Sequence, residues 1–140
     1  MLDISAADIQ REPGVPPRDP DDLLPLTPAI FHILLALASG ECHGYGIMQQ
    51  VADLTDGQTQ LGPGTLYRSI QRMVLDGLIE ELESGDAKPA EPERRRVYRM
   101  TAFGKQVAKA EAQRLAVLVR AAFKRKLISE YPPGGEKELP

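Results

Sequence analysis

The sequence predicts a mainly α-helical fold with one small β-hairpin, and three observations support this prediction. Three short apolar segments with helical spacing lie between residues 27 and 76. Two strand-like runs, "LIEELE" and "RRVYRM", follow with a polar loop between them. The segment 102–128 then has apolar residues spaced four and three apart, which is typical of a helix that packs against another helix.

The composition is that of one modest globular domain. The chain has 140 residues, of which 42% are hydrophobic and 26% charged. A single cysteine, Cys42, excludes an internal disulfide and provides no cysteine pair for a metal. The acidic, proline-rich start is unlike a secretion signal, and the longest apolar run, "AIFHILLALA", is too short to cross a bilayer. We therefore expect a cytoplasmic protein with no membrane partner.

The charges are unevenly distributed along the chain. The net charge is −3, but the segment 94–126 contains eleven Lys or Arg residues and a single acid, Glu111. The segment 80–93 instead holds six acids and one lysine, Lys88. Such asymmetry indicates an anionic partner for the basic part of the chain.

Residues 1–25 are predicted to form a flexible, proline-rich acidic arm that folding does not require, because they hold five of the twelve prolines and little periodic apolar surface.

The first helix is expected after Thr27, a good N-cap, and should end at Gly40. Its inward stripe is Ile30, Ile33, Leu34 and Leu37. Phe31 and Leu35 lie off this stripe, so the helix is apolar nearly all round, which indicates a second copy of the chain.

Two more helices are expected before the hairpin. The first runs from about Tyr45 to Leu54, with Ile47, Val51 and Leu54 facing inward, and a short strand could follow at 59–61. The second begins at Pro63 and ends at Gly77. Its inward residues are Leu66, Ile70, Met73 and Val74, and its opposite face carries Thr65, Arg68, Ser69, Gln71 and Arg72, with Tyr67 at the border.

Thr101 is predicted to cap the last helix, 102–128. Its apolar stripe contains Ala108, Ala112, Leu115, Val119 and Ala122, with Leu118 and Phe123 beside it. The tail, 129–140, has the composition of a disordered segment.

Three helices followed by a hairpin are the winged form of the helix-turn-helix, whose third helix enters the major groove of DNA. Residues 26–101 therefore form a predicted DNA-binding domain and 102–128 a dimerisation helix. In this reading, the turn "GPG" at 62–64 presents the first amides of the third helix towards a phosphate. A nucleotide-binding P-loop would need a lysine that is missing here.

Three blocks, "HGYGIMQQV", "LGPGTLYRSIQRMVLDGLIE" and "RRRVYRMTAFGK", together resemble the PadR family of transcriptional regulators over roughly 26–128. The family tetrad "GTLY" corresponds to residues 64–67, and its strand end "YRLT" to residues 98–101, with Met100 in place of leucine. The resemblance implies a winged helix and a homodimer formed through the C-terminal helix. It also implies repression that a small molecule or another signal relieves, and the single final helix resembles the shorter subclass.

The predicted site residues form two sets, and no cofactor, metal or catalytic residue is expected. The DNA-contact set is Tyr45, Gly64, Thr65, Tyr67, Arg68, Gln71, Arg72, Lys88 and Arg95. The dimerisation set is Phe31, Leu35, Leu115, Leu118, Val119 and Ala122.

Less specific roles stay open for several of these residues. The outer face of the third helix could simply be solvated, Tyr45 and Tyr67 could pack against the core, and one of Arg94–Arg96 could pair with an acid across the hairpin.

The predicted function is therefore a DNA-binding, homodimeric transcriptional repressor that is not an enzyme. The expected partners are a double-stranded operator, a second copy of the chain and an effector of unknown identity. The alternative is a winged-helix adaptor that binds another protein and no DNA.

Overall fold

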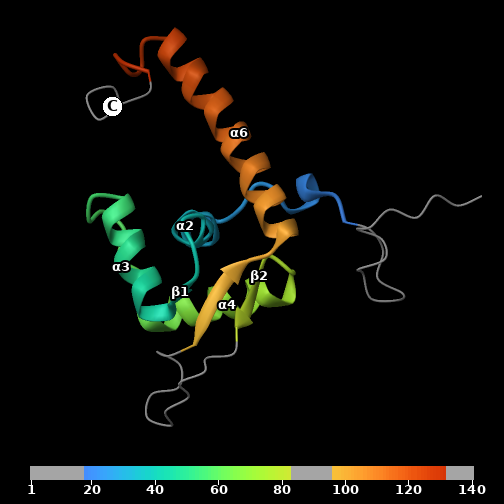
Figure 1. Cartoon of the computed structure of the whole chain (residues 1–140). Helices are drawn as coiled ribbons and strands as arrows, with labels where there is room; N and C mark the ends of the chain where they lie inside the picture. Colours follow the sequence, from blue (N-terminus) through green and yellow to red (C-terminus); the bar gives the residue numbers. More distant parts are fainter. Residues whose placement is uncertain (1–17, 83–95, 132–140) are drawn as a thin grey trace, which may run out of the picture.

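The computed structural model describes residues 18–82 and 96–131, and it confirms a mainly helical fold with a small antiparallel sheet (Figure 1). Its elements, in chain order, are the 3-10 helix η1 (Pro20–Leu23), α2 (Pro28–Leu37), β1 (Cys42–His43), α3 (Gly44–Leu54), α4 (Pro63–Leu75), β2 (Ile79–Leu82), β3 (Val97–Met100) and α6 (Ala102–Lys124).

The predicted helix boundaries are confirmed where a cap or a glycine defines them. The hydroxyl of Thr27 accepts a hydrogen bond from the amide of Ile30 at 3.3 Å, so α2 begins where the sequence predicts. Gly77 has a φ of 78°, a left-handed conformation that favours glycine, and it follows the end of α4.

The sheet has the strand order β1-β3-β2, and the predicted hairpin is its β2–β3 pair. Strand β1, in which Cys42 lies opposite Tyr98, was not predicted from the sequence. The strand suggested at 59–61 is absent. There, the amide of Thr59 instead bonds to the hydroxyl of Thr55 at 3.0 Å, so this stretch closes the end of α3.

The core lies between α2, α3, α4, the sheet and the first half of α6. Most residues predicted to face inward are buried, whereas Ile30 is half-buried. Two predictions are wrong: Leu54 is 52% exposed and Val74 is 42% exposed. Leu54 is the last residue of α3, and Val74 follows Met73, which already takes the inward position. The fully or nearly buried apolar residues are Ile33, Leu34, Ala36, Leu37, Ile47, Val51, Leu66, Ile70, Met73, Leu78, Ile79, Tyr98 and Val107.

The prediction of a flexible arm up to residue 25 is wrong for its described part. The carboxylate of Asp19 caps η1 by accepting from the amide of Asp21 at 2.9 Å. Leu23, Leu24 and Leu26 pack against the core, and Figure 1 shows this segment beside the first turns of α6. The apolar surface that these partly buried leucines remove from water offsets the cost of ordering the segment. Residues 1–17 lie outside the described residues.

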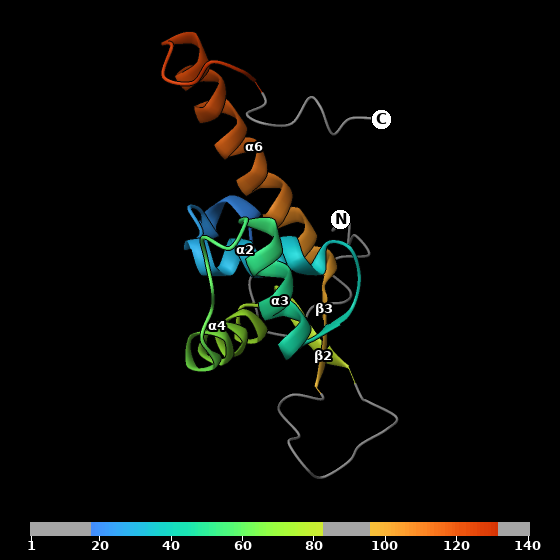
Figure 2. The ribbon, with the colours of Figure 1, turned by 90° about the vertical axis from the view of Figure 1, so that its left-hand side faces the viewer.

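The long helix α6 leaves the rest of the fold after its first half (Figure 2). Its buried residues are Gly104, Val107 and Glu111, and those after Glu111 are half-buried or exposed. The helix ends at Lys124, four residues before the predicted end, and the chain then turns so that Tyr131 packs on Phe123, with ring centroids 6.0 Å apart. Most of the predicted tail, 132–140, lies outside the described residues. In the part of the chain that is described, no helix combines the length and apolar character needed to cross a membrane.

Candidate nucleic-acid interface

Helix α4 separates a buried face from an exposed polar face. Leu66, Ile70 and Met73 are buried in the core. The opposite face exposes Gly64, Thr65, Arg68, Gln71 and Arg72, all of which belong to the predicted DNA-contact set. The helix therefore presents one continuous row of polar side chains outward.

The N-terminus of α4 is open to its surroundings. Its N-cap is Gly62, so no side chain caps the first amides. A Cβ atom at Gly62 would meet nothing within 4 Å, and one at Gly64 would meet only the Arg68 Nη1 atom at 3.4 Å. Gly62 has a φ of −74° and Gly64 lies within the helix. Neither packing nor backbone conformation therefore requires glycine here, and a cationic guanidinium lies beside the uncapped end.

Tyr67 differs from its neighbours because its ring also has a packing role. A Cβ atom on the buried Gly44 would overlap the Tyr67 hydroxyl, so glycine at the start of α3 makes room for the tyrosine. A Cβ atom at Gly46 would similarly come within 2.6 Å of the Cys42 sulfur. The glycines of the "HGYG" motif thus let α3 lie close to α4 and β1.

A groove of about 590 Å³ is lined by residues of α3, α4 and β3. It brings together four predicted contact residues, Tyr45, Gly64, Tyr67 and Gln71. Tyr45 is half exposed and Tyr67 half-buried. The remaining lining residues are Met48, Pro63, Ile70, Arg96 and Tyr98. Lys88 and Arg95 lie outside the described residues, so their predicted contacts stay predictions.

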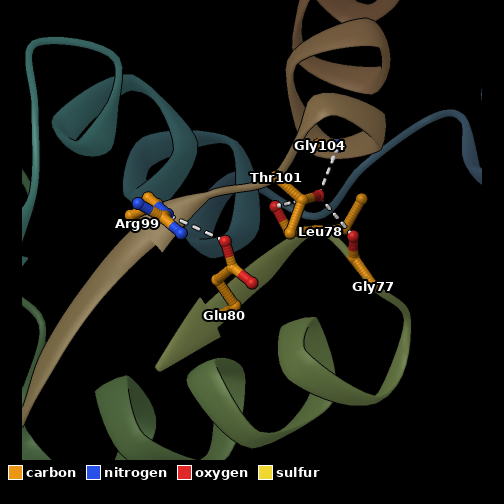
Figure 3. Close-up of polar contacts among 6 residues, drawn as sticks. All are labelled: Gly77, Leu78, Glu80, Arg99, Thr101 and Gly104. Atoms are coloured by element: carbon orange, nitrogen blue, oxygen red, sulfur yellow. Dashed lines mark hydrogen bonds and ion pairs between the residues drawn. The ribbon is translucent and has the colours of Figure 1, made fainter. Parts of the chain in front are cut away.

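Arg99 of strand β3 and Arg96, which directly precedes this strand, are paired with acids of β2. Arg99 Nε donates to Glu80 Oε2 at 2.8 Å, as Figure 3 shows, and Arg96 Nε lies 3.6 Å from Glu81 Oε2. The predicted cross-hairpin pairing is therefore confirmed for Arg96. Burial, followed by the nearby Glu81 charge, raises the pKa of the Tyr98 hydroxyl, which favours its protonated form.

Arg72 is also paired, at the far end of α4. Its Nε donates to Asp76 Oδ2 at 3.2 Å, one turn along the helix. Asp76 also lies 4.0 Å from the guanidinium of Arg18. Thr65, Arg68 and Gln71 lie nearer the open end of the helix, and Arg68 forms no ion pair with another described residue.

Thr101 fastens the start of α6 to the end of α4 (Figure 3). Its hydroxyl donates to the carbonyls of Gly77 and Leu78, at 2.5 and 3.1 Å, and accepts from the amide of Gly104 at 2.9 Å. A Cβ atom at Gly104 would collide with the Leu78 carbonyl. Residues in two motifs, "YRMT" and "TAFGK", therefore join the two helices closely.

The role of Glu111 was not predicted from the sequence. Its carboxylate is only 2% exposed and accepts from Arg114 Nε at 2.6 Å, Arg114 Nη2 at 3.0 Å and the amide of Leu26 at 3.1 Å. Hydrogen bonds from Arg114 lower the pKa of Glu111 although burial acts in the opposite direction. The signal in the sequence was its position as the single acid among eleven basic residues.

The predicted dimerisation residues lie on α2 and on the second half of α6. Leu35 and Leu118 are exposed, and the others, Phe31, Leu115, Val119 and Ala122, are half-buried.

The described residues contain no set of side chains suited to metal binding. No group of three or more His, Cys, Asp or Glu side chains lies close enough together there to hold a metal ion. Burial raises the pKa of the half-buried Cys42 thiol, which opposes formation of a nucleophilic thiolate.

Comparison with known proteins identifies the family. Residues 33–110, more than half of the chain, match the family described as "Transcriptional regulator PadR-like family". The transcriptional regulator Rv3488 of Mycobacterium tuberculosis is 32% identical over 90 residues, which are 64% of this chain and 78% of that protein. An uncharacterized 37.1 kDa protein of a Streptomyces fradiae transposon is 32% identical over 91 residues, 65% of this chain but only 24% of that protein.

Solved structures agree with this assignment. A PadR family transcription regulator from Clostridium difficile has 25% identity and a TM-score of 0.56, covering 71% of this chain and 98% of that chain. A transcriptional regulator from Clostridium thermocellum has 24% identity and a TM-score of 0.57, covering 69% of this chain and 87% of that one, and it supports the fold alone. The prediction of a regulator, and not an enzyme, is confirmed by the family: this chain belongs to the PadR-like family of transcriptional regulators.

Proposed function

We propose that the protein is a homodimeric repressor that binds a double-stranded operator through α4 and is released by a signal or ligand not yet identified. The single observation that carries the DNA-binding part is the open N-terminus of α4, which continues into an exposed face of polar side chains.

The exposed face of α4 has the chemistry needed to read bases. Arg68 and Gln71 can each form two hydrogen bonds with one base edge in the major groove, and Thr65 can contact a phosphate or a thymine methyl group. All three are exposed, and they lie on one side of the helix. We therefore assign sequence readout to Arg68 and Gln71.

The open helix end and the adjacent groove suit the DNA backbone. Uncapped amides and the helix dipole attract a phosphate, and the Arg68 guanidinium lies beside them. Glycine at positions 62 and 64 allows a strand to approach without meeting a side chain. Tyr45 and Arg96, at the groove, would contact the sugar-phosphate chain next to the site that α4 reads.

A second copy of the chain would cover the second half of α6. The 23 residues of this helix span about 34 Å at 1.5 Å per residue, and its buried positions end at Glu111. Beyond that point Val117 is 68% exposed and Leu118 is 54% exposed. Exposed Leu35 and Leu54, on α2 and α3, add apolar surface that a partner could bury.

The proposal is tested by selecting duplexes from random DNA with the purified protein and then titrating the selected operator at several salt concentrations. The affinity should fall steeply with salt, because each neutralised phosphate releases counterions. In transcription from a promoter that overlaps the operator, the protein should lower the yield of transcript. Absence of duplex binding at low salt would contradict the proposal and favour the adaptor alternative.

The dimer is tested separately by sedimentation. The wild-type chain should sediment as a dimer, and the double variant Leu115→Asp, Val119→Asp should be monomeric and bind the operator weakly. A well-folded wild-type monomer would overturn the proposed dimer. The variant Lys105→Asp, on the exposed surface of the first half of α6, is a control that should remain dimeric.

A further inference from the structure

Residues 18–26 form a segment, here called the strap, that contacts both the end of α4 and the first half of α6. The strap precedes the residues that match the family, 33–110, and one of its contacts on α6, Glu111, follows them. The strap therefore lies outside the matched part of the chain. Its apolar contacts come from Leu23, Leu24 and Leu26, which pack against the core.

The first end of the strap contacts both helices. The guanidinium of Arg18 lies over the Phe103 ring, 5.1 Å from its centroid, in the first turn of α6. It also lies 4.0 Å from the carboxylate of Asp76, the C-cap of α4. Arg18 thus joins the end of the proposed recognition helix to the beginning of α6.

The second end of the strap is attached to α6 by a buried charge. The Leu26 amide donates to Glu111, whose remaining hydrogen bonds come from Arg114. Burying a carboxylate is costly, and an apolar side chain at this position would pack as well at lower cost. What the carboxylate adds is direction: two hydrogen bonds from Arg114 hold the Glu111 carboxylate in place on α6, and one hydrogen bond from the Leu26 amide joins it to the strap.

Two attachment points define the axis of α6 relative to the DNA-binding domain. The first is Thr101, bonded to Gly77 and Leu78 at the base of the helix. The second is Glu111, ten residues later and therefore about 15 Å further along the helix axis. Between these two points Val107 is also buried in the core, and Glu111 is the last buried residue along the described helix.

We propose that Glu111 is a positioning residue that sets the angle of α6 through the strap and thereby determines which spacing between operator half-sites the dimer accepts. The inference rests on the proposed homodimer and its DNA binding. In such a dimer the α6 helices join the two protomers, so the direction of α6 sets the separation of the two α4 helices.

The test measures that separation directly. A nitroxide label is placed at Leu75→Cys, an exposed position at the end of α4, in a Cys42→Ser background, and the distance between the two labels of the dimer is measured by pulsed electron resonance with and without Glu111→Gln. We expect a narrow distance distribution for the parent protein and a broader or shifted one for Glu111→Gln. The same variant should bind operators with the spacer shortened or lengthened by one base pair nearly as well as the selected operator, while its affinity for a single half-site stays unchanged.

A purely structural role is distinguished by a matched control. Val51→Ala removes buried volume in α3, far from the strap in the chain, and should lower the melting temperature without changing the label distance or the spacing preference. If Glu111→Gln lowers the melting temperature but changes neither the label distance nor the spacing preference, the positioning role is overturned.

A second variant covers the case in which Glu111→Gln fails to fold. Arg18→Ala leaves the buried pair intact and removes the contacts of the strap with Phe103 and Asp76, so it should broaden the label distance to a smaller extent. An unchanged distance distribution in Arg18→Ala, together with an unchanged spacing preference, would overturn the proposal in that case. A wild-type monomer on sedimentation would instead contradict the proposed dimer, which is a separate failure.

Discussion

Helices α4 and α6 begin in opposite ways, although glycine lies in the first turn of both. At α6, the Thr101 side chain caps the helix and Gly104 is buried against the Leu78 carbonyl. At α4, the N-cap is Gly62, no side chain caps the helix, and the space around Gly62 and Gly64 is open. One helix start is satisfied by the protein itself, whereas the other leaves its amides for an outside partner. The same residue type thus serves packing in one helix and access in the other.

The largest expected effect comes from adding one methyl group at each glycine. Gly104→Ala places a Cβ atom against the Leu78 carbonyl and should lower the free energy of unfolding by about 3 kcal/mol or more. Gly64→Ala meets no obstacle and should raise stability by up to about 1 kcal/mol, because alanine favours a helix more than glycine does. Chemical denaturation of both variants checks this. Similar losses in the two would mean that the fold also requires Gly64.

The next effect concerns the cap itself. Thr101→Val keeps the shape of the side chain but removes the hydroxyl and its bonds to Gly77, Leu78 and Gly104, so the free energy of unfolding should fall by roughly 1–2 kcal/mol. Thermal melting of Thr101→Val and of the wild type measures this loss, and the exposed Thr65→Val variant is the control. Equal stability of Thr101→Val and the wild type would show that the junction between α4 and α6 does not depend on this hydroxyl.

A buried charge supports α6 further along, so its attachment should depend on pH. Since the folded-state pKa of Glu111 is lowered, its contribution is present above the unfolded pKa and is lost as the pH falls through the folded pKa. Acidification should therefore destabilise the wild type more than Glu111→Gln. Melting curves of both proteins from neutral to acidic pH test this, and parallel curves would contradict the sign of the shift.

The smallest expected change in stability, that of a new cap on α4, should be accompanied by an opposite change in DNA affinity. Gly62→Asp supplies the missing cap and an anion near the positive end of the α4 dipole, which should stabilise the fold by a few tenths of a kcal/mol up to about 1 kcal/mol. The same carboxylate would repel a phosphate, so affinity for DNA should fall. Gly62→Asn, a neutral cap, is the matched control for the charge. A variant that gains stability and keeps full affinity would argue against a phosphate at this end of α4.

Local rules predicted most of the fold. The caps Thr27 and Thr101, the start at Pro63 and the stop at Gly77 are properties of a few neighbouring residues, and all of them are confirmed. The pairing of Arg96 with an acid of β2 follows from hairpin geometry alone. The outward face of α4 could likewise be read from a helical period.

The features that were missed depend on contacts between distant parts of the chain. Strand β1 has two residues and exists because Cys42 pairs with Tyr98, which no local pattern reveals. The strap was predicted to be a flexible arm because it is rich in prolines and acids, whereas in the structure its three leucines pack, partly buried, against the core. Glu111 stood out in the sequence only as the single acid of a basic segment, and its contact could not be predicted because its partner Leu26 lies 85 positions away.

The site was predicted only in part for a related reason. The exposed positions of Thr65, Arg68 and Gln71 follow from the helical period, but the packing of Tyr67 over Gly44 and the ion pair between Arg72 and Asp76 required the structure. These contacts identify the first half of α4 as the better candidate for base readout.

The most direct test of this account is the operator preference of Arg68→Ala and Gln71→Ala. Each variant is titrated against the selected operator and a scrambled duplex at two salt concentrations, with Arg99→Ala, whose guanidinium is paired with Glu80, as control. Loss of a bidentate base contact should cost about 1–3 kcal/mol on the operator and much less on scrambled DNA, so the ratio of the two affinities should fall in both variants. Arg99→Ala should leave that ratio unchanged. An unchanged ratio in both Arg68→Ala and Gln71→Ala would contradict the assignment of α4 as the helix that reads the operator.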